Sequence, residues 1–193
     1  TILSGDNTFK IGDDPSFFSG LFASTTRPSA GSGGTVRLST SDLRVLDQAR
    51  IEVDSQGSGT AGNMAIAADT VRLDNGRLTA ETAAVNGGNI VLEGLDLLLL
   101  RNGSLISTTA GTDGTGGNGG NIDIQAAAVV SVPDENSDIL ANAFSGSGGN
   151  VRINTSGLFG ITAQSQDNPL ANDITASSEL VTPGTVDIAT PDT

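Results

Sequence analysis

Apolar and polar residues alternate in short runs along this chain, and each run follows a turn of small residues. The most regular copies read GGNIVL, GGNIDI and GGNVRI, and the pattern occurs six times, at residues 33–38, 61–66, 87–92, 119–124, 148–153 and 183–188. After the polar residue that follows each turn, positions +1 and +3 are apolar in every copy, as in a half-buried strand. A motif repeated at this interval predicts a fold of stacked units.

The Asn or Thr after each turn is an anchor that aligns the repeats: Thr35, Asn63, Asn89, Asn121, Asn150 and Thr185. A second apolar pair begins about eight residues later, at Leu43/Val45, Val71/Leu73 and Leu97/Leu99, and in the next repeat slips by one to Val130/Val132. A third pair begins about sixteen residues after the anchor, at Ile51/Val53, Leu78/Ala80, Leu105/Ser107, Ile139/Ala141 and Ile174/Ala176. Each repeat is expected to hold three short strands, with the named residues pointing inward.

A single unit of this kind cannot bury its apolar face, whereas stacked units can. The pattern therefore predicts an all-β fold, a right-handed parallel β-helix (solenoid) with three short strands per coil and about six to seven coils. The right-handed sense follows from the strong preference for right-handed crossovers between parallel strands. In the first coil, Phe9/Ile11 and Leu21/Ala23 are expected to be the second and third strands.

We expect a single β-helix segment, 1–193. It divides into an irregular first coil at 1–34, regular coils at 35–184 and an incomplete last coil at 185–193. No signal-peptide pattern is present, so the chain reads as a fragment or a matured piece of a longer protein.

The recurring turn residues have structural explanations. The glycine pairs are expected to allow positive φ and close backbone approach. The anchors Thr35, Asn63, Asn89, Asn121, Asn150 and Thr185 are expected to form a turn ladder, with each side chain bonded to the next. This interpretation leaves neither feature for a ligand, and we predict no cofactor-binding residues.

The charge and composition exclude several functions. The net charge of −13 argues against nucleic acid and anionic lipid as partners. Membrane insertion is not predicted either. The chain has no Cys and no His, which removes thiol nucleophiles, disulfides and the usual general base. No apolar run approaches the roughly 20 residues of a membrane-spanning helix.

Catalysis and metal binding are not predicted. Some polysaccharide-active enzymes carry paired carboxylates on a β-helix face, and the outward acidic candidates here are Glu52, Asp123 and Asp187. Arg152 lies between the last two in the expected stack, and Trp and Tyr are absent, so we predict that the protein is not an enzyme. No Asp recurs in the register of a calcium solenoid, although the acidic turns at 13–14 and 134–138 are candidates for weak Ca²⁺ binding.

Residues 119–124 (GGNIDI), 132–139 (VPDENSDI), 142–144 (NAF) and 148–150 (GGN) resemble large exoproteins of the filamentous-haemagglutinin-like type, which are exported by two-partner secretion. The similarity is greatest to the cyanobacterial type, and residues 172–179 and 184–188 look like the end of a repeat region in such proteins. The resemblance covers nearly the whole chain, although the family's N-terminal secretion domain is not in it. It implies a right-handed parallel β-helix, export through an outer-membrane partner, an extracellular or cell-surface location and no catalytic residues.

The leading hypothesis is therefore a distal, non-catalytic rod segment that mediates adhesion or spacing at the cell surface, with an unknown receptor or polysaccharide as its partner. One alternative is a polysaccharide-binding or polysaccharide-degrading β-helix protein. Another is a self-assembling extracellular filament or sheath subunit that associates end to end. Binding is expected in the irregular loops, chiefly at 110–117, 133–138 and 164–172, because variable loops on a constant scaffold carry function.

Overall fold

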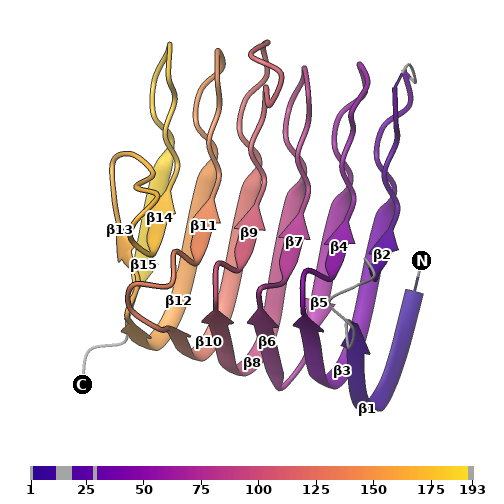
Figure 1. Ribbon diagram of the computed structural model, residues 1–193, viewed down its shortest axis with the longest axis vertical. Helices are drawn as coiled ribbons and strands as arrows, with labels where there is room; N and C mark the ends of the chain where they lie inside the picture. The colour runs from indigo at the N-terminus through magenta and orange to yellow at the C-terminus, as the bar shows by residue number, and fades with distance from the viewer. Residues whose placement is uncertain (1, 12–18, 28–29, 191–193) are drawn as a thin grey trace.

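The computed structural model describes residues 2–11, 19–27 and 30–190, which form parallel β-strands and no α-helix. Two sheets contain all the strands. Sheet A runs in the order β1-β3-β5-β8-β10-β12-β15, with β6 pairing β3 and β8, and sheet B runs β13-β14-β11-β9-β7-β4-β2 (Figure 1). The strands are β1 (Ile2–Ile11), β2 (Gly20–Phe22), β3 (Thr35–Leu46), β4 (Arg50–Glu52), β5 (Asn63–Ala67), β6 (Thr70–Asp74), β7 (Arg77–Thr79), β8 (Asn89–Arg101), β9 (Leu105–Ser107), β10 (Asn121–Ser131), β11 (Asp138–Leu140), β12 (Asn150–Phe159), β13 (Thr162–Ala163), β14 (Asp173–Thr175) and β15 (Thr185–Ala189).

The chain winds through sheet A and then sheet B in each coil, and every coil pairs in parallel with the next (Figure 1). Five complete coils lie between successive anchors, and partial coils stand at both ends. The anchors pair in unbroken register at Thr35, Asn63, Asn89, Asn121, Asn150 and Thr185. The expected parallel β-solenoid is confirmed.

The first and second strands expected in each coil are mostly one long strand. β3, β8, β10 and β12 each span both segments, and only the coil of β5 and β6 keeps them apart. In the first coil, β1 pairs with β3 so that Phe9 lies opposite Leu43, and β2 pairs with β4 so that Leu21 lies opposite Ile51, as the pattern predicted.

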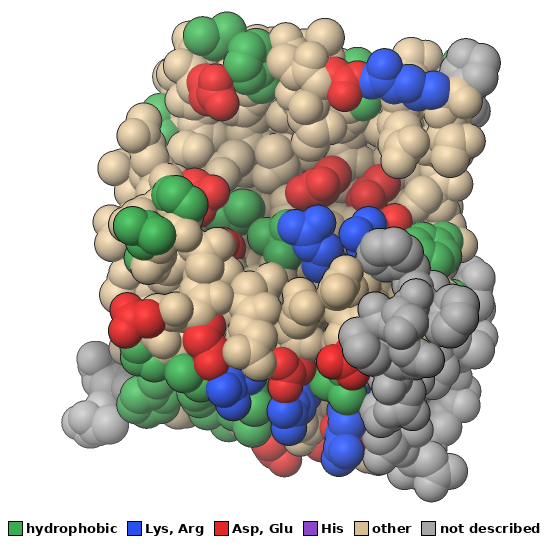
Figure 2. Space-filling view, viewed as in Figure 1, with side chains coloured by type: hydrophobic (Ala, Val, Ile, Leu, Met, Phe, Trp, Pro, Cys, Tyr) green, Lys and Arg blue, Asp and Glu red, His purple; other side chains and the backbone are tan. Residues whose placement is uncertain are grey.

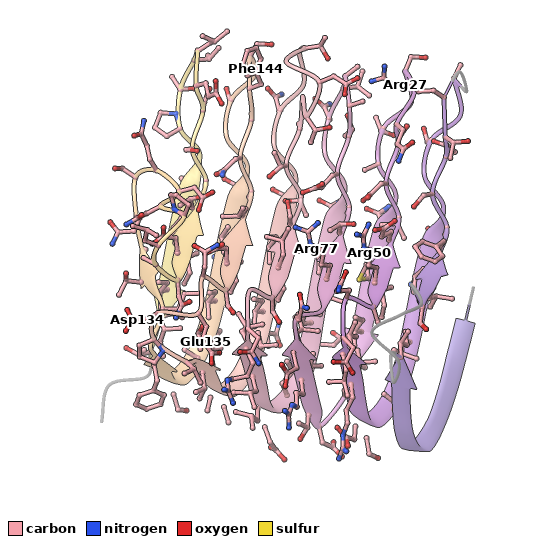
Figure 3. All side chains as sticks on the ribbon, viewed as in Figure 1. Arg27, Arg50, Arg77, Asp134, Glu135 and Phe144 are labelled. Atoms are coloured by element: carbon pink, nitrogen blue, oxygen red, sulfur yellow. The ribbon has the colours of Figure 1, made fainter. Side chains whose placement is uncertain are left out.

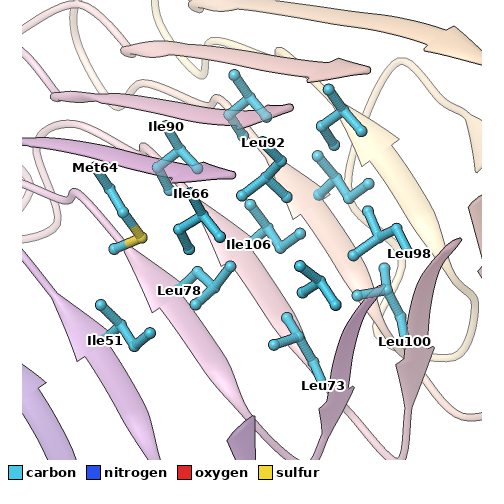
Figure 4. Packing of buried hydrophobic residues seen from close by; sticks show 14 of the residues in the cluster. Ile51, Met64, Ile66, Leu73, Leu78, Ile90, Leu92, Leu98, Leu100 and Ile106 are labelled. Carbon is cyan, nitrogen blue, oxygen red and sulfur yellow. The ribbon is translucent and has the colours of Figure 1, made fainter. Parts of the chain in front are cut away.

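The inward residues form one core that both sheets share (Figure 4). The apolar pairs at +1 and +3 are buried in the five complete coils, as expected, and Val186 and Ile188 of the last coil are partly buried. In sheet B, Ile51, Leu78, Ile106, Ile139 and Ile174 lie in one fully buried row.

Three of the predicted inward pairs are wrong by one residue. The buried pairs are Leu98/Leu100, Val129/Ser131 and Ile106/Thr108, where the pattern predicted Leu97/Leu99, Val130/Val132 and Leu105/Ser107. The extra residue lies in β8, where the register with β10 shifts and Gly94 has φ +75°. One inserted residue reverses which side chains point inward beyond it. The offset then continues into β9, and β10 itself does not slip.

The second glycine of each anchor turn lets one coil rest directly on the next. An added Cβ at this position would lie 1.7–1.8 Å from the corresponding glycine carbonyl oxygen of the preceding coil, and this contact recurs at Gly62, Gly88, Gly120, Gly149 and Gly184. The same carbonyls accept hydrogen bonds from the anchor amides, as in Asn121 N to Gly88 O at 3.2 Å. None of the described glycines in these turns has positive φ, so that part of the expectation was wrong. Close backbone approach is what requires glycine here.

The insertion at 164–172 folds back over one end of sheet B. β13 precedes it and pairs with β14 at Thr162/Asp173 and Ala163/Ile174, on the side away from β11 (Figure 1). This is the edge at which the equivalent strand of a further coil would pair. β13 and the insertion therefore cap that edge, whereas β15 ends sheet A beside β12.

Candidate functional site

Amide side chains form a ladder along one corner of the solenoid. Each donates from Nδ2 to the Oδ1 of the preceding coil's anchor: Asn89 to Asn63 at 2.7 Å, Asn121 to Asn89 at 2.8 Å and Asn150 to Asn121 at 2.9 Å. Thr185 continues the row by donating its hydroxyl to Asn150 Oδ1 at 2.8 Å. Thr35 is in register with Asn63 at the other end. These side chains are exposed, so the ladder lies on the surface of the solenoid.

The outer face of sheet B, called the sheet-B face below, carries polar and charged side chains in three rows. Its first row is Arg50, Arg77, Leu105, Asp138 and Asp173. Its second row is Glu52, Thr79, Ser107, Leu140 and Thr175. Its third row, Asp54, Glu81, Thr109, Asn142 and Ser177, immediately precedes the bridged residues Ser55, Thr82, Ala110, Ala143 and Ser178. Figure 2 shows acidic and basic side chains gathered in the middle of this face, and Figure 3 shows Arg50 and Arg77 side by side from adjacent coils.

A second ladder, which the sequence pattern did not predict, connects coils across the third row. Asp54 accepts the Thr79 hydroxyl at 2.9 Å and the Glu81 amide at 2.8 Å. Asn142 likewise accepts the Thr175 hydroxyl at 2.7 Å and the Ser177 amide at 2.8 Å.

Glu81 accepts the Ser107 hydroxyl in the same way. The sequence did contain a signal for this ladder, because a polar acceptor directly follows the second inward residue of the third strand in these coils. The distance of that residue from the anchor varies between coils, so the signal is not in register with the anchors.

Asp54 and Glu81 are acids in adjacent coils with pKa values shifted in the same direction. Burial raises the pKa of Asp54 to about 7; the Glu81 carboxylate adds to this, and the hydrogen bonds from the Glu81 amide and Thr79 oppose it. Burial also raises the pKa of Glu81, against the Ser107 hydrogen bond and the charge of Arg77. General acid–base pairs usually need environments that push the two pKa values apart. The pKa values of Asp54 and Glu81 are both raised, so this pair lacks that division of roles.

An open groove of about 710 Å³ borders the third row. Its wall includes Thr109, Asn142 and Ser177 from the sheet-B face, the Phe144 ring, and Glu179 from the loop of the last complete coil. Gly111, Thr112 and Gly114 of the 110–117 loop and Gln166 and Asp167 of the 164–172 insertion also line it. Two of the three loops expected to carry binding therefore meet at this groove.

The third loop, 133–138, does not line this groove. Glu135 accepts hydrogen bonds from Nε and an Nη of Arg101, each at 2.8 Å, and from the Asn102 amide, so both of its carboxylate oxygens are engaged. Asp134 and Asn136 lie in the left-handed region with φ 62° and 52°. The acidic turn at 13–14, the other weak Ca²⁺ candidate, lies outside the described residues.

The outward acids weighed for catalysis do not meet. Glu52 lies on the sheet-B face, 3.3 Å from Arg50. Asp123 and Asp187 lie on sheet A, both paired in register with Arg152, which stands between them, and Asp187 approaches Arg152 to 3.6 Å.

Three further carboxylates do converge, where the insertion meets sheet B. One oxygen from each of Asp138, Asp167 and Asp173 lies within 4.8 Å of the others. Asp138 belongs to the acidic turn at 134–138 and Asp167 to the 164–172 loop, both of which were singled out in the sequence, whereas Asp173 belongs to neither. Asp167 and Asp173 are brought to it by the cap, whose fold the sequence did not predict.

The described residues include no helix that is long and apolar enough to cross a membrane. No protein-family model, curated protein or solved structure matches the chain. The fold and the groups on its surface are therefore the basis for assigning a function.

Proposed function

We propose that this chain is a non-catalytic rod segment of a secreted, filamentous-haemagglutinin-like surface exoprotein, which serves adhesion or spacing outside the cell. The observation that carries the proposal is that the recurring residues are used in stacking. The turn glycines allow coil contact, the anchors form a ladder and the alternating apolar residues fill the core. A repeat used in this way extends a structure and has no recurring ligand site.

The absence of catalysis in the proposal is supported by the acids on the sheet-B face. Asp54 and Glu81 already accept hydrogen bonds from the following coil, and both pKa values are raised. A glycosidase of the common kind needs one protonated and one ionised carboxylate across the scissile bond. The raised pKa values of Asp54 and Glu81 favour the protonated form of both acids.

The location can be tested on cells of the source organism. Antibodies raised against this chain are expected to label intact cells or the surrounding medium, and the labelling should be lost when the gene of the outer-membrane secretion partner is deleted. A cytoplasmic protein stained in parallel controls for cell lysis. Labelling that requires permeabilised cells would contradict the proposal.

A second candidate, polysaccharide binding, is favoured by the groove beside the third row. Hydroxyl, amide and carboxylate groups line it together with the Phe144 ring, and sites for sugars combine such polar groups with an apolar surface. We propose a neutral polysaccharide, because the net charge of −13 repels polyanions.

Affinity electrophoresis in gels containing neutral polysaccharides tests this candidate. Retardation of the wild-type chain is expected to weaken in Glu179→Ala and Gln166→Ala, both exposed at the groove, and to persist in Asp96→Asn on sheet A. Equal retardation of all the variants, or none, would remove the candidate. Release of reducing ends from the polysaccharide would instead contradict the non-catalytic proposal.

End-to-end assembly into filaments is the remaining alternative. The cap by β13 occupies the sheet-B edge, so another copy could pair there only after displacing it. We therefore expect a monomer in sedimentation velocity at all concentrations tested. Filaments that grow with concentration would favour the filament alternative.

A further inference from the structure

Three carboxylates meet where the 164–172 insertion closes over sheet B. Asp138 is the first residue of β11 and Asp173 the first residue of β14, and the two strands pair in parallel with Ile139 opposite Ile174. Asp167 comes from the insertion itself, and one oxygen of each carboxylate lies within 4.8 Å of the other two. Three chain segments from two neighbouring coils therefore contribute to one cluster.

The cluster contains a buried carboxylate oxygen without a partner. Asp173 is 0% exposed, and its Oδ1 has no hydrogen-bond partner, although its Oδ2 accepts the Asn168 amide at 2.6 Å. One oxygen of this carboxylate belongs to the cluster, so the unpaired oxygen is either that atom or its neighbour on the same carbon. Asp138 is 6% exposed and accepts the Asp173 amide at 2.9 Å through Oδ1. A buried, unpaired carboxylate oxygen is unfavourable unless a cation or donor reaches it.

Within the described part of the chain, no Lys or Arg forms an ion pair with any of the three carboxylates. Burial raises the pKa of Asp138 to about 6, and the charges of Asp167 and Asp173 act in the same direction. Burial and the Asp173 charge also raise the pKa of Asp167. Mutual repulsion of this kind is what a bound cation relieves.

The geometry points to a Ca²⁺ site formed by Asp138, Asp167 and Asp173, in which the ion fastens the cap to the end of sheet B. Ca²⁺ prefers carboxylate and carbonyl oxygens at about 2.3–2.6 Å, so opposite ligands of one ion stand roughly 5 Å apart. The observed limit of 4.8 Å fits that span. Backbone carbonyls and water would complete the coordination of Ca²⁺, which takes about 6–8 oxygens.

The site gives the insertion a role that the sequence did not reveal. Asp167 is exposed and lies on the loop, whereas Asp138 and Asp173 are held by the sheet. An ion shared by all three would hold the loop and β13 against β14. Removal of Ca²⁺ is therefore expected to loosen the cap while the central coils stay folded.

Calcium titration of the full chain, stripped with a chelator, tests the site. Isothermal titration calorimetry should show one Ca²⁺ site, and Asp167→Asn should raise its dissociation constant at least about tenfold, because affinity follows the number of charged ligands. Asp134→Asn removes the same charge from an exposed turn outside the cluster and should bind Ca²⁺ like the wild type. Calcium should also slow proteolysis within 164–172 in the wild type and in Asp134→Asn, but not in Asp167→Asn.

The result can overturn the proposal in several ways. No binding heat and no protection of the loop by Ca²⁺ would exclude the site. Equal calcium affinity in Asp167→Asn and the wild type would show that the ion binds elsewhere. Equal affinity for Mg²⁺ would contradict the assignment to Ca²⁺, because Mg²⁺ demands a tighter octahedral site. Asp167 lies on an exposed loop, so this variant is expected to fold, and its far-UV circular dichroism spectrum checks that it does.

Discussion

Substitution of Gly120 by alanine tests whether close coil contact is why the anchor turns contain glycine. A Cβ at Gly120 would lie 1.8 Å from Gly88 O and 2.9 Å from the Thr108 Cβ, whereas real Cβ contacts below 3.0 Å are essentially absent. The backbones of two coils must therefore separate by about 1 Å. That movement stretches the hydrogen bond from the Asn121 amide to Gly88 O, which is already 3.2 Å long.

The magnitude follows from two contributions. Loss of one backbone hydrogen bond costs about 1 kcal/mol, and overpacking of a well-fitted contact costs about 1–3 kcal/mol. The smaller conformational entropy of alanine in the unfolded chain offsets about 0.4–1 kcal/mol. We therefore expect Gly120→Ala to lower the free energy of unfolding by about 1–4 kcal/mol.

Urea denaturation followed by far-UV circular dichroism measures this change, with Gly116→Ala as the matched control. Gly116 has only the Ser145 Oγ near an added Cβ, at 3.6 Å, and it does not have positive φ. The control should be neutral or slightly stabilised, by up to about 1 kcal/mol. If both variants were equally stable, the steric explanation of the glycine turns would be refuted.

Three further changes test other parts of the structure. Asn121→Ala removes one donated and one accepted hydrogen bond of the anchor ladder, which lies on an exposed corner. Thermal denaturation should therefore show that the free energy of unfolding falls by about 1 kcal/mol. A fall of several kcal/mol would mean that the ladder is more than a surface feature. Ile122→Asp places a charge at a side chain that is 1% exposed and should cost several times as much; an unchanged melting temperature would show that Ile122 does not point inward. Asp54 has a folded pKa of about 7 against an ordinary 3.8, so the folded state binds its proton more tightly and this group lowers stability as pH rises between those values. The stability of Asp54→Asn relative to wild type should therefore rise by up to about 4 kcal/mol between pH 4 and pH 8, and a difference that stayed constant over this range would contradict the raised pKa of Asp54.

The sequence pattern predicted the solenoid, the anchor register and the inward residues near each anchor, because turn, amide and alternation recur together there. It failed where nothing in the sequence showed which of two alternate sets of positions faces the core. Residues 95–100 contain five leucines, so either set of alternate positions could face the core, and only the extra residue at Gly94 in β8 decides between them.

The surface chemistry was less predictable because it depends on contacts between coils. The ladder contacts of Asp54 and Glu81 depend on hydroxyl and amide donors in the next coil, about 25 residues further along the chain. The cluster of Asp138, Asp167 and Asp173 requires the insertion to fold back past β14, and nothing in the local sequence specifies that path. Non-local contacts of this kind are invisible to a periodicity argument.

The stacking of coils in this register is the central claim, and an engineered disulfide tests it most directly. Asn89 and Asn121 pair across β8 and β10, and the chain has no Cys of its own. Neighbouring parallel strands lie about 4.8 Å apart, which is within the roughly 4.4–6.8 Å between Cα atoms that a disulfide spans. Asn89→Cys/Asn121→Cys should therefore cross-link within the monomer on mild oxidation, as seen by non-reducing electrophoresis and peptide mass spectrometry. Asn89→Cys/Asp123→Cys, two residues further along β10, should not cross-link, and the opposite result would contradict the stacked register.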